Sequence, residues 1–295
     1  MLSLKAINKT FNQTKAVQNI NLEIRPGSIY GLLGPNGAGK TTTIRMIMDI
    51  IKPDSGEIWI NDHRIQKADY DKIGYLPEER GLYQKSKLKE TIGYFAELKG
   101  LSLRNAHKRA DEYLARFDLS EYADRKIQEL SKGNQQKVQF IIAIISEPKL
   151  VILDEPFSGL DPVNQILLKE IIEEMNEKGA TVIFSTHQME QVEKMCDDIC
   201  LINKGQIVLE GNLKTIKKNY GLKTVEVDYE GEQSSLENLD TIKLMKLNED
   251  HLLGELQSED SINDVLNELI SKVTVKEFKI NEPSLEQIFI EQVKK

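Results

Sequence analysis

The chain has 295 residues, of which 40% are hydrophobic and 29% are charged. This is an ordinary composition for a globular protein, and at ~150 residues per domain the length predicts about two domains. The 18 glycines and 8 prolines exclude collagen-like and low-complexity classes, and the 2 cysteines cannot form a disulfide framework. The net charge of −8 argues against a protein that binds the phosphate backbone of nucleic acids, so no nucleic-acid partner is expected.

The first 220 residues are expected to alternate short apolar strands with helices, which is typical of an α/β domain. Strands are expected at residues 2–11, 16–24, 28–33, 57–60, 73–75, 150–153, 181–185, 199–202 and 206–210. Helices are expected at residues 40–50, 87–119 with a break near Gly100, 134–146, 162–178 and 190–195.

A change in charge divides the chain. Residues 1–220 carry 31 basic and 30 acidic side chains, whereas residues 221–295 carry 8 lysines, no arginine and 17 acidic side chains. We therefore predict one domain over residues 1–220 and a small acidic α+β domain over residues 221–295. The second is expected to hold strands at 224–229, 242–247, 251–256 and 273–280, a helix at 261–271 and a closing helix begun by Pro283.

None of the apolar segments is long enough to cross a bilayer. The most apolar run, residues 138–146, falls far short of the ~20 residues that a spanning helix needs. The first ten residues also lack the apolar core of a signal peptide. We expect a cytoplasmic protein, with any membrane contact supplied by another chain.

A glycine-rich loop follows the apolar strand at 28–33 and precedes a helix. The run from Gly34 to Thr41 fits the pattern G-x-x-x-x-G-K-[ST], whose backbone N–H groups surround phosphates. Lys40 is expected to reach the β- and γ-phosphates of a nucleotide, and Thr41 to place its hydroxyl on Mg²⁺. The residues expected to contact the nucleotide here are Gly34, Pro35, Asn36, Gly37, Ala38, Gly39, Lys40, Thr41 and Thr42.

A pair of carboxylates follows the apolar strand at 150–153. Ligands bind at the carboxyl ends of the strands in α/β sheets. Asp154 is therefore expected near the metal, and Glu155 is expected to act as general base for a water that attacks the γ-phosphate. A GTPase is not favoured, because the string Asn203-Lys204-Gly205-Gln206 lacks the aspartate that reads guanine.

Further motifs then follow in a definite order. Residues 130–137 read L-S-K-G-N-Q-Q-K, residues 157–161 read F-S-G-L-D, and residues 185–187 read S-T-H. Together with the phosphate loop and the Asp-Glu pair, they resemble the signature, D-loop and H-switch of ATP-binding cassette (ABC) ATPases. Phe11 stands where that family keeps an aromatic side chain that stacks on adenine, and residues 73–78 stand at its Q-loop. The resemblance covers roughly residues 2–215.

The resemblance implies a P-loop ABC cassette with a RecA-like core, an antiparallel β subdomain and a helical subdomain at about 86–146. It implies a head-to-tail homodimer or pseudo-dimer in which Ser131, Gly133 and Asp161 contribute to the ATP site of the opposing subunit. It also implies that His187 hydrogen-bonds the γ-phosphate and the attacking water. ATP and Mg²⁺ are the implied cofactors, and a membrane-spanning permease subunit is the implied partner.

Two departures from the family pattern stand out. In the signature, Lys132 and Asn134 replace the usual glycine and glutamine. Glu78 stands where the family usually has glutamine; it can still ligate Mg²⁺ together with Thr41 and Asp154, or it can be a surface carboxylate.

The expected function is that of the ATP-hydrolysing subunit of an ABC transporter, peripheral on the cytoplasmic face of the cell membrane. Residues 282–290 resemble the tail of ATPases from sodium-extruding and bacitracin-exporting systems, which favours an exporter. The alternative is a non-transport ABC ATPase acting on ribosomes or nucleic acid, which the single cassette and the acidic charge disfavour. The sequence does not identify the transported substrate.

Overall fold

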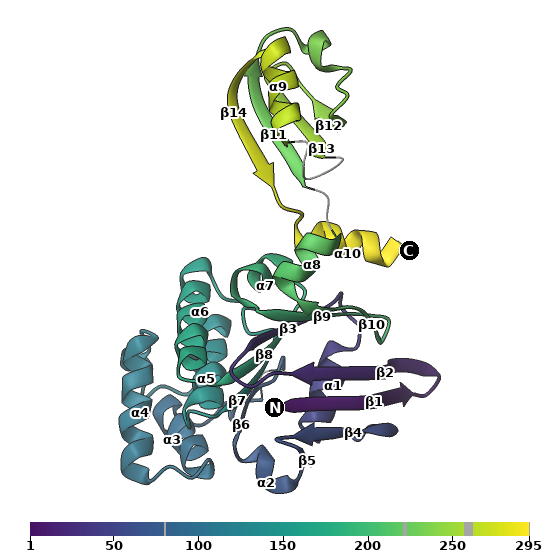
Figure 1. The fold of residues 1–295 in the computed structure, drawn as a ribbon. Coiled ribbons are helices and arrows are strands. Elements are labelled where there is room, and N and C mark those ends of the chain that lie inside the picture. The colour runs from purple at the N-terminus through teal and green to yellow at the C-terminus, as the bar shows by residue number, and fades with distance from the viewer. Residues whose placement is uncertain (80, 221–222, 257–261, 295) are drawn as a thin grey trace. The chain divides into compact units, whose positions relative to one another are not determined.

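The computed structural model describes residues 1–79, 81–220, 223–256 and 262–294 (Figure 1). The chain forms two compact units, Met1–Asn212 and Leu213–Lys295. The division thus falls before residues 213–220, whereas the change in charge placed it after them. These residues, for which the sequence predicted no helix, form helix α8 (Leu213–Tyr220). It buries Leu213 and Ile216 and contacts α10 (Leu285–Lys294) of the second unit.

The first unit is built on a six-stranded sheet of order β10-β9-β3-β8-β7-β6, parallel except for β10. Every residue of β3, β7 and β8 is buried, as expected for strands of a parallel sheet. The strands are β3 (Ile29–Leu33), β6 (Ile73–Leu76), β7 (Leu150–Asp154), β8 (Thr181–Thr186), β9 (Asp198–Asn203) and β10 (Gln206–Asn212). The helices that contact them are α1 (Lys40–Ile47), α5 (Lys132–Ile144), α6 (Pro162–Glu177) and α7 (Met189–Met195).

An antiparallel sheet of order β2-β1-β4-β5 forms a second layer of this unit (Figure 1). Its strands are β1 (Leu2–Phe11), β2 (Thr14–Ile24), β4 (Ser55–Ile60) and β5 (His63–Arg64), followed by the short helix α2 (Lys67–Tyr70). Apolar side chains of both sheets and of α1 form one continuous core, exemplified by Ile7, Ile44 and Ile152, none of which is exposed to solvent. Helix α1, which follows the glycine-rich loop, is therefore held between two sheets.

The expected helical subdomain is present between β6 and β7. It consists of α3 (Leu88–Leu98), α4 (Leu103–Arg116) and α5, with short 3₁₀ turns at Ser120–Tyr122 and Ile127–Glu129. Gly100 separates α3 from α4, as predicted. The fully buried side chains of Phe117 and Phe140 meet edge to face and join the end of α4 to α5.

The second unit has a four-stranded antiparallel sheet of order β12-β13-β11-β14. Its elements are β11 (Thr224–Glu230), the 3₁₀ turn Gln233–Leu236, β12 (Ile242–Leu247), β13 (His251–Leu256), α9 (Ile262–Lys272), β14 (Thr274–Asn281) and the flanking helices α8 and α10. Val225, Val227 and Tyr229 of β11 face a core shared with Val265 and Leu269 of α9. The α+β prediction is thus confirmed for this part of the chain; Ser261, the expected first residue of α9, lies outside the described residues.

Several predicted helix ends were wrong by a few residues, and three of them have a clear local cause. Helix α1 ends at Ile47 instead of Ile50, because Asp49 adopts a left-handed conformation with φ of 58°. Helix α5 begins at Lys132 instead of Asn134, since Ser131 caps it. Helix α10 begins at Leu285 instead of Pro283, because Ser284 Oγ accepts a hydrogen bond from the backbone N–H of Gln287 at 3.2 Å.

Among the residues that the structure describes, no helix combines the length and apolar character that crossing a membrane requires.

Two glycines should respond in opposite ways to an added methyl group. A Cβ at Gly74 would lie 2.2 Å from the Ala143 carbonyl oxygen, whereas a Cβ at Gly93 would meet no atom within 4 Å. Gly74→Ala should therefore lower the free energy of unfolding by about 1–3 kcal/mol through overpacking. Gly93→Ala, in the middle of α3, should raise it by ~0.5–1 kcal/mol through helix propensity. Urea unfolding followed by circular dichroism measures both, and an equally stable Gly74→Ala protein would contradict the close approach of β6 and α5.

Candidate functional site

The phosphate loop joins β3 to α1, and its two ends lie close to neighbouring backbone. A Cβ at Gly34 would lie 2.2 Å from the Ile202 carbonyl oxygen, and one at Gly39 would lie 2.6 Å from the Ala16 carbonyl oxygen. Both glycines also have positive φ angles, 149° and 111°. Only glycine meets both demands, so the sequence pattern of the loop follows from how closely it approaches β9 and β2.

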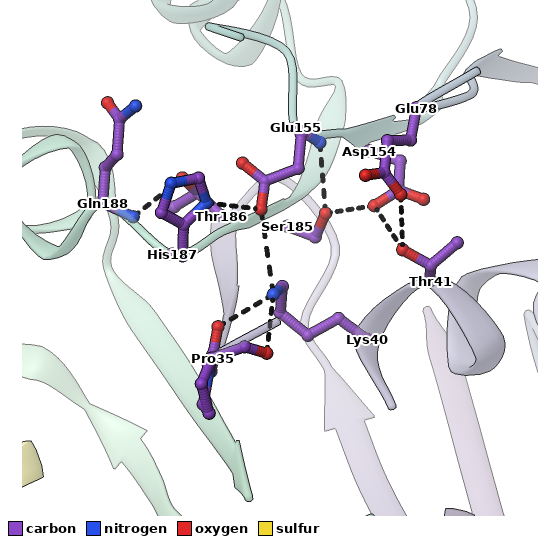
Figure 2. Close-up of polar contacts among 11 residues, drawn as sticks. Pro35, Lys40, Thr41, Glu78, Asp154, Glu155, Ser185, Thr186, His187 and Gln188 are labelled. Atoms are coloured by element: carbon purple, nitrogen blue, oxygen red, sulfur yellow. Dashed lines mark hydrogen bonds and ion pairs between the residues drawn. The ribbon is translucent and has the colours of Figure 1, made fainter. Parts of the chain in front are cut away.

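Lys40 begins α1 and is only 6% exposed. Its ammonium group donates hydrogen bonds to the carbonyl oxygens of Gly34 at 2.8 Å and Pro35 at 3.3 Å. The same nitrogen lies 3.7 Å from Glu155 Oε1 (Figure 2). The loop thus holds a buried cation directly beside the carboxylate that was expected to act as general base.

A cavity of about 180 Å³ lies over this loop. Its lining includes seven of the nine loop residues expected to contact the nucleotide, and Glu78 and Glu155 also line it. The lining residues are Ala16, Asn36, Gly37, Ala38, Gly39, Lys40, Thr41, Thr42, Glu78 and Glu155. Free N–H groups at the start of α1 and the ammonium of Lys40 make this a place for an anion.

Asp154, the last residue of β7, is fully buried and is held from two sides. Ser185 Oγ donates a short hydrogen bond to Asp154 Oδ1, and Thr41 Oγ1 lies 3.3 Å from the same oxygen. Burial raises the pKa of the Asp154 carboxyl, and the hydrogen bonds from Ser185 and Thr41 oppose that rise. Its other oxygen, Oδ2, has no hydrogen-bond partner within the described part of the chain.

Glu155 follows in a left-handed conformation, with φ of 49°. Such a conformation costs of order 1 kcal/mol in a residue other than glycine and needs support from its surroundings. The support comes from Ser185, whose carbonyl oxygen and Oγ each accept a hydrogen bond from the Glu155 N–H at 3.2 Å. In this conformation the Glu155 carboxylate points at His187, whose Nδ1 lies 3.0 Å from Glu155 Oε1 (Figure 2).

Glu78 lies two residues beyond the end of β6 and is exposed. Its Oε2 lies 3.3 Å from Thr41 Oγ1, the same hydroxyl oxygen that Asp154 Oδ1 approaches (Figure 2). Carboxylate and hydroxyl oxygens are the ligands that Mg²⁺ prefers, and the unpartnered oxygen of Asp154 belongs to this group. The side chains of Thr41, Glu78 and Asp154 therefore fit an Mg²⁺ ion.

The remaining expected site residues do not line the cavity. Ser131 caps α5, and Asp161 caps α6 by accepting a hydrogen bond from the Asn164 N–H at 3.0 Å. Gly133 lies against the D-loop, since a Cβ there would come within 3.3 Å of the Gly159 carbonyl oxygen. Phe11 ends β1 with 44% of its surface exposed, and Lys9 Nζ lies 5.5 Å from its ring centre.

Two residues of this site, Ser185 and Ala16, were not predicted from the sequence. Ser185 was seen only as part of a three-residue motif, yet it supports both Asp154 and Glu155. Its position at the end of an apolar strand was the available signal, because strands β7 and β8 pair with Asp154 opposite Ser185. Ala16, which lines the cavity, carried no signal.

Comparison with known proteins identifies the family. A family model described as ABC transporter matches residues 17–158, and a model described as the C-terminal domain of DrrA1-3-like ATP-binding proteins matches residues 211–293. The uncharacterized ABC transporter ATP-binding protein YhaQ of Bacillus subtilis is 43% identical over 99% of this chain and 98% of its own length. The chain belongs to the ABC transporter ATP-binding protein family.

Two further comparisons agree with this assignment. The Nod factor export ATP-binding protein I of Cupriavidus metallidurans is 33% identical over 77% of this chain and 76% of its own length. A dimeric ATP-binding cassette, solved in a post-hydrolysis state bound to ADP and phosphate, has a TM-score of 0.67 and 27% identity over 72% of this chain and 99% of that one. The predicted family and fold class are confirmed, and the chain is the ATPase subunit of an ABC transporter; action on ribosomes or nucleic acid is not favoured.

The buried charge of Asp154 should make the protein less stable when no ligand is bound. Because burial raises the Asp154 pKa, the native state binds a proton there more tightly than the unfolded chain does. The free energy of unfolding therefore falls as the pH rises through the raised pKa. Asp154→Asn removes this fall. At pH 7 in EDTA, the free energy of unfolding of the variant should therefore be roughly 1 kcal/mol higher than that of the wild type.

The measurement is urea unfolding of both proteins at pH 7 and at a pH below the ordinary aspartate range, where the difference should vanish. Asp161→Asn is the control, and it should lower the free energy of unfolding at pH 7 instead of raising it. Hydrogen bonds from Asn164 hold the Asp161 pKa below its usual range, so the charged form of Asp161 stabilises the fold. An Asp154→Asn protein that is less stable than the wild type at pH 7 would contradict this account.

Proposed function

We propose that this chain hydrolyses ATP to ADP and phosphate within a dimer of ATPase subunits and thereby drives export through a membrane-spanning partner. The observation that carries the proposal is the meeting of Lys40, Glu155 and His187 beside a loop suited to phosphates. Glu155 Oε1 lies 3.7 Å from the Lys40 ammonium and 3.0 Å from His187 Nδ1. A cation for the phosphates, a base and a residue that positions the base thus occupy one edge of the sheet.

In the first step, residues 34–42 hold the phosphates of ATP. Backbone N–H groups of the loop donate to the phosphate oxygens, and Lys40 turns from its contact with Glu155 toward the β- and γ-phosphates. The contact between Lys40 and Glu155 therefore changes when ATP binds. The carboxylate loses its neighbouring cation and becomes available as a base.

Thr41, Glu78 and Asp154 would hold the Mg²⁺ ion, which neutralises phosphate charge when it is bound. Glu155 then accepts a proton from the water that attacks the γ-phosphate. His187 keeps the carboxylate in position through Nδ1 and donates to the γ-phosphate once the site is closed.

Closure requires a second subunit, because Ser131, Gly133 and Asp161 do not line the cavity of their own chain. Ser131 and the first N–H groups of α5 present an anion-binding surface, and Asp161 and Gly159 lie in the adjacent D-loop. We assign these residues to the ATP held by the opposing subunit, in a homodimer or a pseudo-dimer. The solved cassette compared above is a dimer, which supports this arrangement.

We assign the side chain of Phe11, which is about half exposed, to stacking on the adenine of ATP.

We assign the binding surface for the membrane partner to the helical subdomain. Tyr83 and Tyr94 are 58% and 50% exposed and form an aromatic cluster with Phe95. Leu98, at the end of α3, is 61% exposed. This apolar surface follows Glu78 closely in the chain, so a partner bound there could sense the ATP site. The protein would then be peripheral on the cytoplasmic face of the membrane, and the name of the Nod factor relative favours export.

Lys40→Ala tests nucleotide binding. A charge-assisted contact to phosphate is worth about 3 kcal/mol, so its loss should weaken ATP binding roughly 100-fold. The control is Lys52→Ala, an exposed lysine paired with Asp49 outside the cavity, which should bind ATP normally. Calorimetric titration with ATP and Mg²⁺ measures both, and near-normal binding by Lys40→Ala would refute the assignment of the loop.

Glu155→Gln should separate hydrolysis from dimer formation. Loss of the base should slow hydrolysis by roughly 10²–10⁴-fold while leaving ATP bound. A stable ATP-bound dimer should then accumulate, and size-exclusion chromatography with light scattering detects it.

Adding Ser131→Arg to Glu155→Gln should abolish that dimer without weakening ATP binding by the monomer. The arginine places bulk where the γ-phosphate of the opposing subunit must dock. Ser102→Arg is the matched control, because Ser102 caps α4 in the same way that Ser131 caps α5. A dimer that survives Ser131→Arg would place the signature outside the interface.

A further inference from the structure

The Thr41 hydroxyl faces two carboxylates and cannot donate a hydrogen bond to both of them at once. Its Oγ1 is 3.3 Å from Glu78 Oε2 and 3.3 Å from Asp154 Oδ1 (Figure 2). A hydroxyl has one proton, so it donates to only one carboxylate at a time. At any moment, Thr41 Oγ1 therefore faces one of the two carboxylate oxygens without a hydrogen atom between them.

The buried carboxylate adds a second, independent sign of a missing positive charge. Asp154 is fully buried, and Ser185 satisfies only its Oδ1. Its Oδ2 is buried without a hydrogen-bond partner among the described residues. A buried carboxylate oxygen without a partner is costly unless a cation is bound nearby.

The nearby cations of α1 are engaged elsewhere. Lys40 contacts the loop carbonyl oxygens and Glu155, and Arg45 pairs with Glu79 at 2.9 Å. Neither makes a hydrogen bond to Glu78 or Asp154 in the described structure. Among the residues that the structure describes, the two carboxylates at Thr41 thus have no direct cationic partner.

We propose that Thr41, Glu78 and Asp154 bind a divalent cation of the Mg²⁺ type before nucleotide arrives. This inference rests on the proposed ATP site and adds an order of binding to it. Two carboxylates give such a cation two formal negative charges, whereas an amide at position 78 would leave Asp154 as the single charged ligand. Glu78 is therefore the residue that makes cation binding independent of ATP.

The order of binding has a consequence for ATP. Without the cation, Glu78 and Asp154 repel a polyanionic nucleotide; with the cation bound, the same site attracts it. Cation and ATP should consequently strengthen each other's binding by the same factor, and this factor should depend on Glu78.

The first experiment is a titration of the full-length, nucleotide-free protein with Mn²⁺, in which electron paramagnetic resonance measures the free ion. The wild type should bind one Mn²⁺ per chain, displaceable by Mg²⁺. Glu78→Gln should weaken this binding by about tenfold or more, because one of two charged ligands is lost. Glu79→Gln is the matched control, since Glu79 is the adjacent, exposed carboxylate that pairs with Arg45, and it should leave Mn²⁺ binding unchanged.

The second experiment measures ATP affinity in EDTA and in Mg²⁺. Glu78→Gln should bind metal-free ATP more tightly than the wild type does, yet gain less affinity when Mg²⁺ is added. If Glu78 had only a structural role, Glu78→Gln would weaken ATP binding both in EDTA and in Mg²⁺. Circular dichroism melts establish that the variant is folded.

Either of two results would overturn the inference: no saturable Mn²⁺ binding by the nucleotide-free wild type, or equal binding by Glu78→Gln. If ATP with Mg²⁺ still binds in those cases, the proposed function stands and only the order of binding fails. Failure of ATP to bind under any condition would instead refute the proposed function.

Discussion

The close approach of the phosphate loop to two neighbouring strands is the constraint on which the rest of the site depends. The loop passes against the backbone of β9 at Gly34 and against that of β2 at Gly39, where any side chain would collide with a carbonyl oxygen. The loop is therefore held by both sheets of the first unit. This sets where α1 begins and hence where Lys40 and Thr41 lie relative to the ends of β6 and β7.

The carboxyl edge of the parallel sheet gathers negative charge that the fold alone does not neutralise. Ser185 supports Asp154 through its hydroxyl and holds the strained Glu155 through its backbone carbonyl. Burial still raises the pKa of Asp154, which means that the charged state is costly in the free protein. A cation is the ligand that relieves such a site, so its binding supplies stability that folding lacks.

Much of the architecture was predictable because it depends on local patterns. The fully buried strands β3, β7 and β8 are apolar runs of the length that parallel strands have, and the loop between β3 and α1 has a pattern with a clear mechanism. Helix α8 was not predicted, since its two buried apolar residues, Leu213 and Ile216, lie in a short lysine-rich segment. Its burial is a property of the packing, which the residues alone do not reveal.

The sequence by itself determined the family, the order of the strands along the chain, and the identity of Lys40 and Asp154 as candidates for phosphate and metal. Only the tertiary structure decided that Ser185 lies opposite Asp154, because strand pairing sets which residues of distant segments meet. It also decided that Glu78 and Asp154 face the same hydroxyl. Distances between charges govern electrostatic energy, and a sequence contains no distances between segments that are remote along the chain.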